Sequence, residues 1–341
     1  MEKIDFVVTW VDGNDPAWQA EKRKYQPSDK VDAGVVRYRD WDVLQYWFRG
    51  VEKFAPWVNH IYFVTWGHIP AWLNTENPKL TVVKHSDFIP EQYLPTFSCR
   101  PIEFNLHRIP GLSENFVYFN DDMFLIAPTK EEDFFKKGLP CDVAMACPLY
   151  FGGKDENGVK WKINQVHLAP IYDMFALNNS FDKREVMKKN WKKWFSPKYG
   201  SAVIRTLLLT PWKKFTGLIC YHLPYSLKKS TFDEVWKENP DQVERACSHK
   251  FRDNTDINSW LLSFWQIAKG EFTPRKPNLG MQFGLGDDNQ RNERIFSYIS
   301  NQKGKIICVN DSVTTMEIDD IRAGLVRAFD SILPEKSSFE K

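Results

Sequence analysis

Three apolar runs that are typical of buried strands each end in a cluster of Asn and Asp residues. The clusters are Asp12, Asn14 and Asp15 after residues 6–11, Asn120, Asp121 and Asp122 after residues 116–119, and Asn310 and Asp311 after residues 306–309. In an open α/β sheet the carboxyl ends of the strands form the crevice in which ligands bind, so carboxylates at these ends are placed to hold a metal ion and phosphate groups. The alternative is that Asn, Asp and Gly simply form the turns that end strands.

The adjacent carboxylates Asp121 and Asp122 are the strongest candidate metal ligands. Magnesium is usually bound by one or two carboxylates and by oxygens of a substrate phosphate, so we expect Mg²⁺, or Mn²⁺ in its place, at this pair. Asp12 and Asp15 would supply a further ligand or contact a substrate hydroxyl, and the Gly-Asn pair between them allows a tight bend.

Two further residues suit chemistry at a phosphate. His222 lies two residues before Pro224, in a segment that should be extended, and histidine is the side chain best matched to taking a proton at neutral pH. Arg252 offers a planar fork for phosphate oxygens, although most arginines are surface residues or members of ion pairs. His85 directly follows a predicted strand and is a second-rank candidate near the crevice.

Composition narrows the class of protein. The 341 residues are 43% hydrophobic and 26% charged with a net charge of +2, which is ordinary for a globular protein and gives no drive toward nucleic acid. The 14 Trp residues suit sugar recognition, because the apolar face of a pyranose can lie on an indole ring. P-loop, dinucleotide-binding, α/β-hydrolase and common zinc motifs are absent from the sequence.

The six scattered cysteines predict reduced thiols, and a cytoplasmic location is expected because no signal peptide or long apolar span is present.

The order of predicted elements positions these residues. Strands at 4–11, 60–65, 80–83 and 116–119 alternate with a helix capped by Asp40 and ended by Pro56, and with a short helix at 102–109. We therefore predict an α/β fold, Rossmann-like or GT-A-like, with a mostly parallel sheet and a largely helical insertion. Its expected parts are an α/β nucleotide-sugar and metal-binding core (1–150), a mostly helical acceptor-side region with His222 and Arg252 (151–275), and a return to the core with a C-terminal helix at 319–333 (276–341). Residues 336–341 are expected to form a frayed tail.

The stretch 183–214 is basic and aromatic. It holds ten Lys and Arg residues and one acidic residue, Glu185, interleaved with Trp191, Trp194, Phe195 and Trp212. A solvated helical face, docking on an anionic membrane surface where a lipid-linked acceptor would lie, and binding of a negatively charged polymer all explain this composition.

Together these motifs resemble the Stealth family of sugar-phosphate transferases, which includes bacterial capsule-polymer enzymes and the animal enzyme that starts the lysosomal mannose 6-phosphate tag. The matching blocks run over residues 4–15, over segments from Arg39 to Met123 that include Ile102-Glu103 and Asn120-Asp121-Asp122, around His222-Leu223-Pro224 and Phe251-Arg252, and over residues 308–311. The chain departs from the family pattern at Ser98-Cys99-Arg100-Pro101, where Asn-Ser, a variable residue and Ala are more usual.

The resemblance implies transfer of a sugar 1-phosphate from a nucleotide sugar, expected to be UDP-linked, to a hydroxyl of an acceptor glycan or lipid-linked oligosaccharide. Asp121 and Asp122, with Asp311, would bind Mg²⁺ and the diphosphate, and Arg252 would neutralise the transferred phosphoryl group. His222 would take the acceptor proton, with Asp15 orienting the attacking sugar or serving as the alternative base. The expected substrate contacts are Asp12, Asn14, His85, Glu103, Asn120 and Asn310.

Two other functions fit the same residues. A GT-A-like glycosyltransferase would use the acidic metal site but break the bond between the sugar carbon and oxygen, releasing a nucleoside diphosphate. A non-catalytic glycan-binding protein would explain the Trp content, but it would not need the acids, His222 and Arg252.

Overall fold

A five-stranded sheet forms the centre of the computed structural model, which describes residues 2–26, 38–150, 152–153, 160, 165–314 and 318–341. The strand order is β3-β2-β1-β4-β8, with the first four strands parallel and β8 antiparallel to β4. The strands are β1 (Ile4–Thr9), β2 (Ile61–Thr65), β3 (Leu80–Lys84), β4 (Asn115–Asn120) and β8 (Tyr225–Lys228). The nearly continuous apolar runs of β1, β2 and β4 are buried, as expected for strands covered on both faces. The predicted α/β class and mostly parallel sheet are confirmed.

A second sheet, and not the central one, carries the third Asn/Asp cluster. Its strand order is β10-β11-β5, from β10 (Gly280–Leu285), β11 (Ile306–Asp311) and β5 (Met123–Leu125). Asp121 and Asp122 form the turn between β4 and β5, so they join the two sheets. Because β11 pairs with β5 and the Val309 N–H donates to the Asp122 carbonyl at 2.8 Å, the third cluster still lies beside the second.

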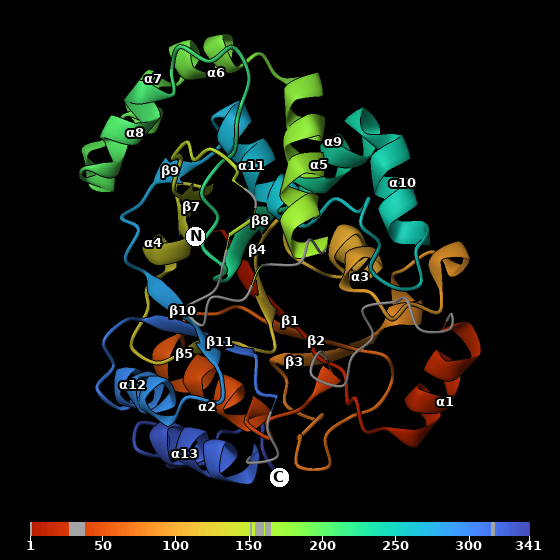
Figure 1. Ribbon diagram of the computed structural model, residues 1–341. Helices are drawn as coiled ribbons and strands as arrows, with labels where there is room; N and C mark the ends of the chain where they lie inside the picture. The colour runs from red at the N-terminus through yellow and green to blue at the C-terminus, as the bar shows by residue number, and fades with distance from the viewer. Residues whose placement is uncertain (1, 27–37, 151, 154–159, 161–164, 315–317) are drawn as a thin grey trace.

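A small third sheet and the helices surround these two sheets (Figure 1). The small sheet contains β6 (Phe135–Lys136), β7 (Leu139–Asp142) and β9 (Thr273–Pro274). The helices are α1 (Pro16–Tyr25), α2 (Leu44–Phe54), α3 (Cys99–Asn105), α4 (Glu131–Phe134), α5 (Gln165–Ser180), α6 (Lys183–Lys189), α7 (Trp191–Trp194), α8 (Ala202–Leu208), α9 (Lys229–Glu238), α10 (Pro240–Ser248), α11 (Trp260–Lys269), α12 (Asn289–Ser300) and α13 (Ile318–Asp330). Among the described residues, no helix is both long enough and apolar enough to cross a membrane.

The middle of the chain is built mainly from helices. Figure 1 shows α6, α7 and α8 as an arc at one edge of the molecule, away from α2, α12 and α13 at the opposite end. The same stretch also supplies β8 to the central sheet, which brings the segment that carries His222 next to β4. The boundary expected at residue 150 adjoins residues outside the described set.

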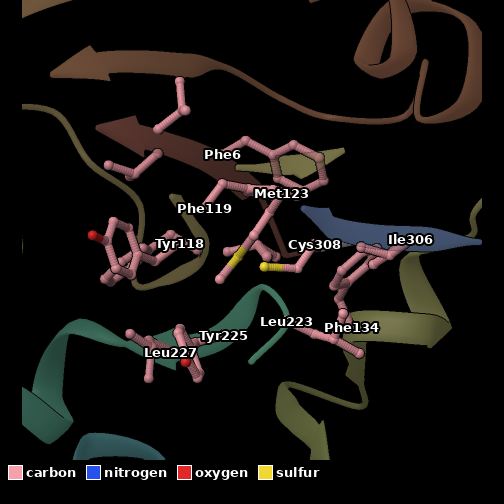
Figure 2. Close-up of a cluster of buried hydrophobic side chains, with 14 of the residues drawn as sticks. Phe6, Tyr118, Phe119, Met123, Phe134, Leu223, Tyr225, Leu227, Ile306 and Cys308 are labelled. Atoms are coloured by element: carbon pink, nitrogen blue, oxygen red, sulfur yellow. The ribbon is translucent and has the colours of Figure 1, made fainter. Parts of the chain in front are cut away.

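The main core fills the space between the sheets. Figure 2 shows Met123 and Cys308, which are partners in the pairing of β5 with β11, above Leu223, which precedes β8, and Tyr225, its first residue. Met123 and Cys308 are fully buried. This packing fixes the position of the turn at Asp121 and Asp122 relative to the His222 segment, because tightly packed interiors leave little freedom for such shifts.

Two local expectations are wrong. Asp40 does not cap α2, which starts after Val43 with no side-chain cap; the Asp40 carboxylate instead accepts a hydrogen bond from the Trp10 indole N–H at 3.1 Å. The C-terminal residues are not frayed, because Phe339 is buried and Arg49 donates two 2.8 Å hydrogen bonds to the Glu340 carboxylate. The six cysteines are free thiols, as predicted.

Candidate functional site

A cavity of about 790 Å³ lies where the carboxyl ends of β1 and β4 meet β11 and the segments around residues 222 and 252. It brings together most of the residues that the sequence singles out, although they are far apart in the chain. The predicted residues that line it are His85, Glu103, Asn120, Asp121, Asp122, His222, Arg252, Asn310 and Asp311.

The first Asn/Asp cluster lies outside the lining of this cavity and serves the local fold. The Asp15 carboxylate caps α1 by accepting a hydrogen bond from the Trp18 N–H at 2.8 Å, and Pro16 takes the first helical position. The Asp12 carboxylate accepts a hydrogen bond from the Asn14 N–H at 2.8 Å. A Cβ at Gly13 would lie 2.0 Å from the Tyr38 carbonyl oxygen, so only glycine fits this bend.

Three carboxylates converge in the cavity. Asp121 is open to the cavity, Asp122 is half-buried, and Asp40, which sequence reasoning treated only as a helix cap, is the third. Desolvation, together with the charges of Asp122 and Asp40, raises the pKa of Asp121 to about 8. The site therefore concentrates negative charge that a cation would neutralise.

His222 contacts two groups through its two ring nitrogens. Its Nδ1 lies 3.2 Å from the Tyr225 hydroxyl, and its Nε2 lies 3.8 Å from Oδ2 of Asp122. The Tyr225 oxygen also accepts a hydrogen bond from the Trp260 indole N–H at 2.7 Å. Burial raises the pKa of Tyr225 well above its usual value, so this residue stays a neutral phenol that orients the imidazole ring.

Arg252 lies on a loop that two sets of local contacts hold in place. Phe251 stacks on Phe97 with ring centroids 5.2 Å apart, and both pack against Trp18 of α1. The buried Asp256 carboxylate accepts a hydrogen bond from the Asp253 N–H at 2.8 Å. Among the described residues the Arg252 guanidinium has no ion-pair or hydrogen-bond partner, so its charge is available to the cavity.

The Asp256 carboxylate also contacts the ring of His249 across the same loop. Its Oδ1 lies 2.7 Å from Nδ1 of His249. Both oxygens of Asp256 are therefore used to fix the loop that presents Arg252.

His85 and Glu103 are buried parts of the cavity wall. Burial lowers the pKa of His85 to about 3, so this side chain stays neutral, and its buried Nδ1 has no hydrogen-bond partner among the described residues. Glu103 accepts a 2.8 Å hydrogen bond from the buried Arg100 guanidinium. That pair comes partly from residues 98–101, the stretch in which the sequence departs from the resemblance.

The third Asn/Asp cluster reaches the cavity from β11 and is already engaged. The Arg39 guanidinium lies 3.0 Å from the Asp311 carboxylate, which also accepts a hydrogen bond from the Val313 N–H at 2.9 Å. Asn310 accepts a 2.9 Å hydrogen bond from the Gln282 side chain. Asp311 is therefore less free to bind a metal than Asp121 and Asp122 are.

The residues present fit a hard divalent cation. The buried Oδ1 of Asp122 has no hydrogen-bond partner among the described residues, which is costly unless a ligand satisfies it. Asp122, His222 and Cys308 also place one potential ligand atom each within 4.8 Å of one another. Burial and the nearby Asp122 raise the pKa of the Cys308 thiol well above its usual value, so it remains neutral and does not suit Mg²⁺ as a ligand.

Three family models match this chain in order. They are Stealth protein CR1, conserved region 1, over residues 2–30, CR2, conserved region 2, over residues 37–141, and CR3, conserved region 3, over residues 221–268. The capsular polysaccharide phosphotransferase WcwK of Streptococcus pneumoniae is 40% identical over 100% of this chain and 99% of its own length.

The chain belongs to the Stealth family.

Other Stealth relatives agree in length as well as in sequence. The receptor polysaccharide phosphotransferase WefC of Streptococcus oralis is 41% identical over the whole of both chains, and the exopolysaccharide phosphotransferase cps2G of Lactiplantibacillus plantarum is 38% identical over 99% of this chain and 96% of its own. This Stealth protein is therefore a phosphotransferase. A solved structure of the bifunctional glycosyltransferase WbbM, at 12% identity, covers 97% of this chain and 52% of its own, but its TM-score of 0.33 is too low to carry an argument.

The three matched Stealth regions contain the first strand end, the Asp121-Asp122 turn, His222 and Arg252. Asn310 and Asp311 lie outside them. Sequence reasoning missed Asp40, Tyr225 and Trp260 as parts of the site. A signal existed for Asp40, which lies in the Arg39-Asp40-Trp41 block, whereas the roles of Tyr225 and Trp260 depend on contacts that only the fold makes.

Proposed function

We propose that this Stealth phosphotransferase transfers a sugar 1-phosphate from a nucleotide sugar, UDP-linked in the first instance, to a hydroxyl of an acceptor glycan. The product is a phosphodiester, and the leaving group is a nucleoside monophosphate. The proposed setting is the synthesis of a capsule or another cell-surface polysaccharide, as the names of its relatives suggest.

One observation carries this proposal. Acids, a proton acceptor and a guanidinium that has no partner among the described residues meet in one cavity, from segments about 100 and 30 residues apart in the chain. Transfer of a phosphoryl group depends on positioning and on neutralising charge, which is what Asp121, Asp122 and Arg252 offer.

Asp121 and Asp122 would hold Mg²⁺ or Mn²⁺, with Asp311, which is already paired with Arg39, as a third candidate. When bound, the cation would neutralise charge on the donor diphosphate. Arg252 binds the oxygens of the phosphoryl group that is transferred, since a guanidinium matches them in geometry and charge. Asn120 and Asn310 are proposed to contact the donor from the ends of β4 and β11.

His222 is the proposed base. With Nδ1 directed at the Tyr225 oxygen, its Nε2 is left to accept the proton of the acceptor hydroxyl, and Asp122 would stabilise the resulting imidazolium. We propose that Asp15 acts indirectly, through α1. His85 and Glu103 are proposed to contact sugar hydroxyls from the cavity wall, and Asp12 and Asn14 to contact the acceptor at the rim.

A screen of nucleotide sugars tests the proposal. The full chain would be incubated with each donor and an acceptor glycan, with Mg²⁺ or Mn²⁺, and the products followed by phosphorus NMR. We expect a phosphodiester signal and one nucleoside monophosphate per transfer for the correct donor. Release of a nucleoside diphosphate with no phosphorus in the glycan would identify a glycosyltransferase and overturn the proposal.

A further inference from the structure

Helices α7 and α8 and the turn after them carry a strip of exposed apolar side chains. Trp191, Ile204, Leu207, Leu208 and Trp212 have exposed fractions of 57%, 60%, 58%, 67% and 54%. Ile204, Leu207 and Leu208 are spaced by three and four residues, so they share one face of α8. We call these five residues the apolar strip.

The apolar strip is unusual for this molecule. Among the described residues, the other exposed large apolar side chains occur singly, apart from one pair on α5. Most of the remaining large apolar side chains are buried. Single exposed apolar residues are normal on soluble proteins, whereas a group on one helical face marks a surface that meets a partner.

The segment that carries the apolar strip also carries exposed cations. Arg184, Lys188, Lys189, Lys192 and Lys213 are exposed in the same segment, which has one acidic residue between 183 and 214. The segment is also tied to the rest of the molecule, because Lys198 donates to the Pro274 carbonyl at 2.7 Å and Arg205 donates to the Ala146 carbonyl at 2.9 Å. The strip and its cations therefore form a fixed surface.

We propose that the apolar strip docks on a membrane surface that contains anionic lipids. The apolar side chains would enter the boundary between headgroups and acyl chains, and the exposed cations of the same segment would contact lipid phosphates. Charge complementarity selects this occupant: a neutral protein partner would not need the surplus of cations, and an anionic polymer would not need the Leu and Ile side chains.

The docked orientation would connect the membrane to the cavity. The Arg205 side chain of α8 donates to the Ala146 carbonyl at 2.9 Å, and Ala146 pairs with Leu218, two residues before Cys220 of the cavity wall. If the proposed function is correct, this geometry suits an acceptor glycan that is anchored to lipid. The docking itself does not depend on that function.

Cosedimentation of the full chain with vesicles tests the proposal. We expect binding to phosphatidylcholine vesicles that contain phosphatidylglycerol, much weaker binding to phosphatidylcholine alone, and loss of binding in high salt. The double change Leu207→Ser and Leu208→Ser should weaken binding about tenfold, while the exposed Met281→Ser on β10 should leave it unchanged.

A second pair of variants tests the charges. Lys188→Glu, Lys189→Glu and Lys192→Glu together should weaken binding to the anionic vesicles by about tenfold or more. The control, Lys237→Glu, Lys276→Glu and Lys303→Glu, makes the same change in net charge at exposed sites elsewhere and should bind nearly as the parent does. All variants should keep the parent's unfolding temperature and its turnover of a water-soluble acceptor.

Three results would overturn the proposal. The first is equal binding to neutral and anionic vesicles. The second is unchanged binding by the Leu207 and Leu208 variant. The third is a dimeric parent and a monomeric Leu207 and Leu208 variant in sedimentation velocity, with equal vesicle binding by the two proteins. The apolar strip would then contact a second copy of the chain.

Discussion

His222 has different partners at its two ring nitrogens, and this difference assigns a task to each. Nδ1 meets the Tyr225 oxygen, which the Trp260 N–H also approaches, whereas Nε2 faces the cavity and Asp122. A ring fixed in this way presents one lone pair to the acceptor hydroxyl, which is the arrangement that general bases need.

Replacement of His222 therefore tests its role as base. His222→Gln should lower turnover about 100-fold or more, because proton transfer by a positioned side chain typically contributes that much. Donor affinity and unfolding temperature should change little. Turnover with saturating donor is the measurement, and His60→Gln, at the opposite end of the central sheet, is the control. Near-parental turnover in His222→Gln would rule out this base.

Metal removal tests the acids. EDTA should abolish turnover and Mg²⁺ or Mn²⁺ should restore it, because the carboxylates of Asp121 and Asp122 lie close together and a bound cation would neutralise their charge. By calorimetry, Asp122→Asn should bind Mn²⁺ at least about tenfold more weakly than the parent. The exposed Asp42→Asn is the matched control. Full turnover in EDTA by both the parent and Asp122→Asn would contradict a metal role.

At the scale of elements, α1 connects the first Asn/Asp cluster to Arg252. Asp15 caps α1 through the amide of Trp18, Trp18 packs against Phe97, and Phe97 stacks on Phe251 next to Arg252. This chain of contacts explains how Asp15 can matter for turnover without lining the cavity.

Two substitutions at Asp15 separate capping from catalysis. Asp15→Asn preserves a good cap and should keep turnover within about threefold of the parent, whereas Asp15→Ala should lower the free energy of unfolding by about 1 kcal/mol. Urea unfolding and steady-state kinetics measure the two effects. If Asp15→Asn lost activity as severely as His222→Gln while remaining as stable as the parent, Asp15 would be the base instead.

At the scale of the whole molecule, buried histidines make stability depend on pH. Burial, with Arg108 and Lys229 nearby, lowers the pKa of His107 to about 3, and its ring stacks on Phe232 with centroids 5.0 Å apart. In the unfolded chain this histidine takes up a proton near pH 6.5. Between about pH 6.5 and 3 the unfolded state therefore binds more protons, so the stabilisation present above pH 6.5 is lost as the pH falls.

His107→Phe keeps a stacked ring and removes this titration. The variant should lose less stability than the parent when the pH is lowered from about 7 to about 5, although its stability at pH 7 itself can differ. Urea unfolding at the two pH values gives the comparison. Equal losses in both proteins would show that His107 does not titrate as its burial implies.

The sequence predicts the parts of this molecule that depend on local patterns. The buried strands β1, β2 and β4 and the aspartates at the end of β4 can be predicted directly from the sequence, because apolar runs and turn residues determine structure over a few positions. The placement of β11 in a second sheet could not be predicted from the sequence. It depends on the pairing of Cys308 with Met123, which are far apart in the chain. Asp40 was assigned to the wrong partner for the same reason: Trp10 competes with the helix end for its carboxylate. Asp15 and Pro16 did carry a readable capping signal.

The fate of the β-phosphorus of the donor tests the central claim most directly. A nucleotide sugar labelled at that atom would be incubated with the full chain, the acceptor glycan and Mg²⁺, and the label followed into the glycan and nucleotide fractions. Sugar-phosphate transfer predicts that the label enters the glycan in equal amount to the sugar, and that an unlabelled nucleoside monophosphate is released. Label that stays in a nucleoside diphosphate while sugar enters the glycan would contradict it.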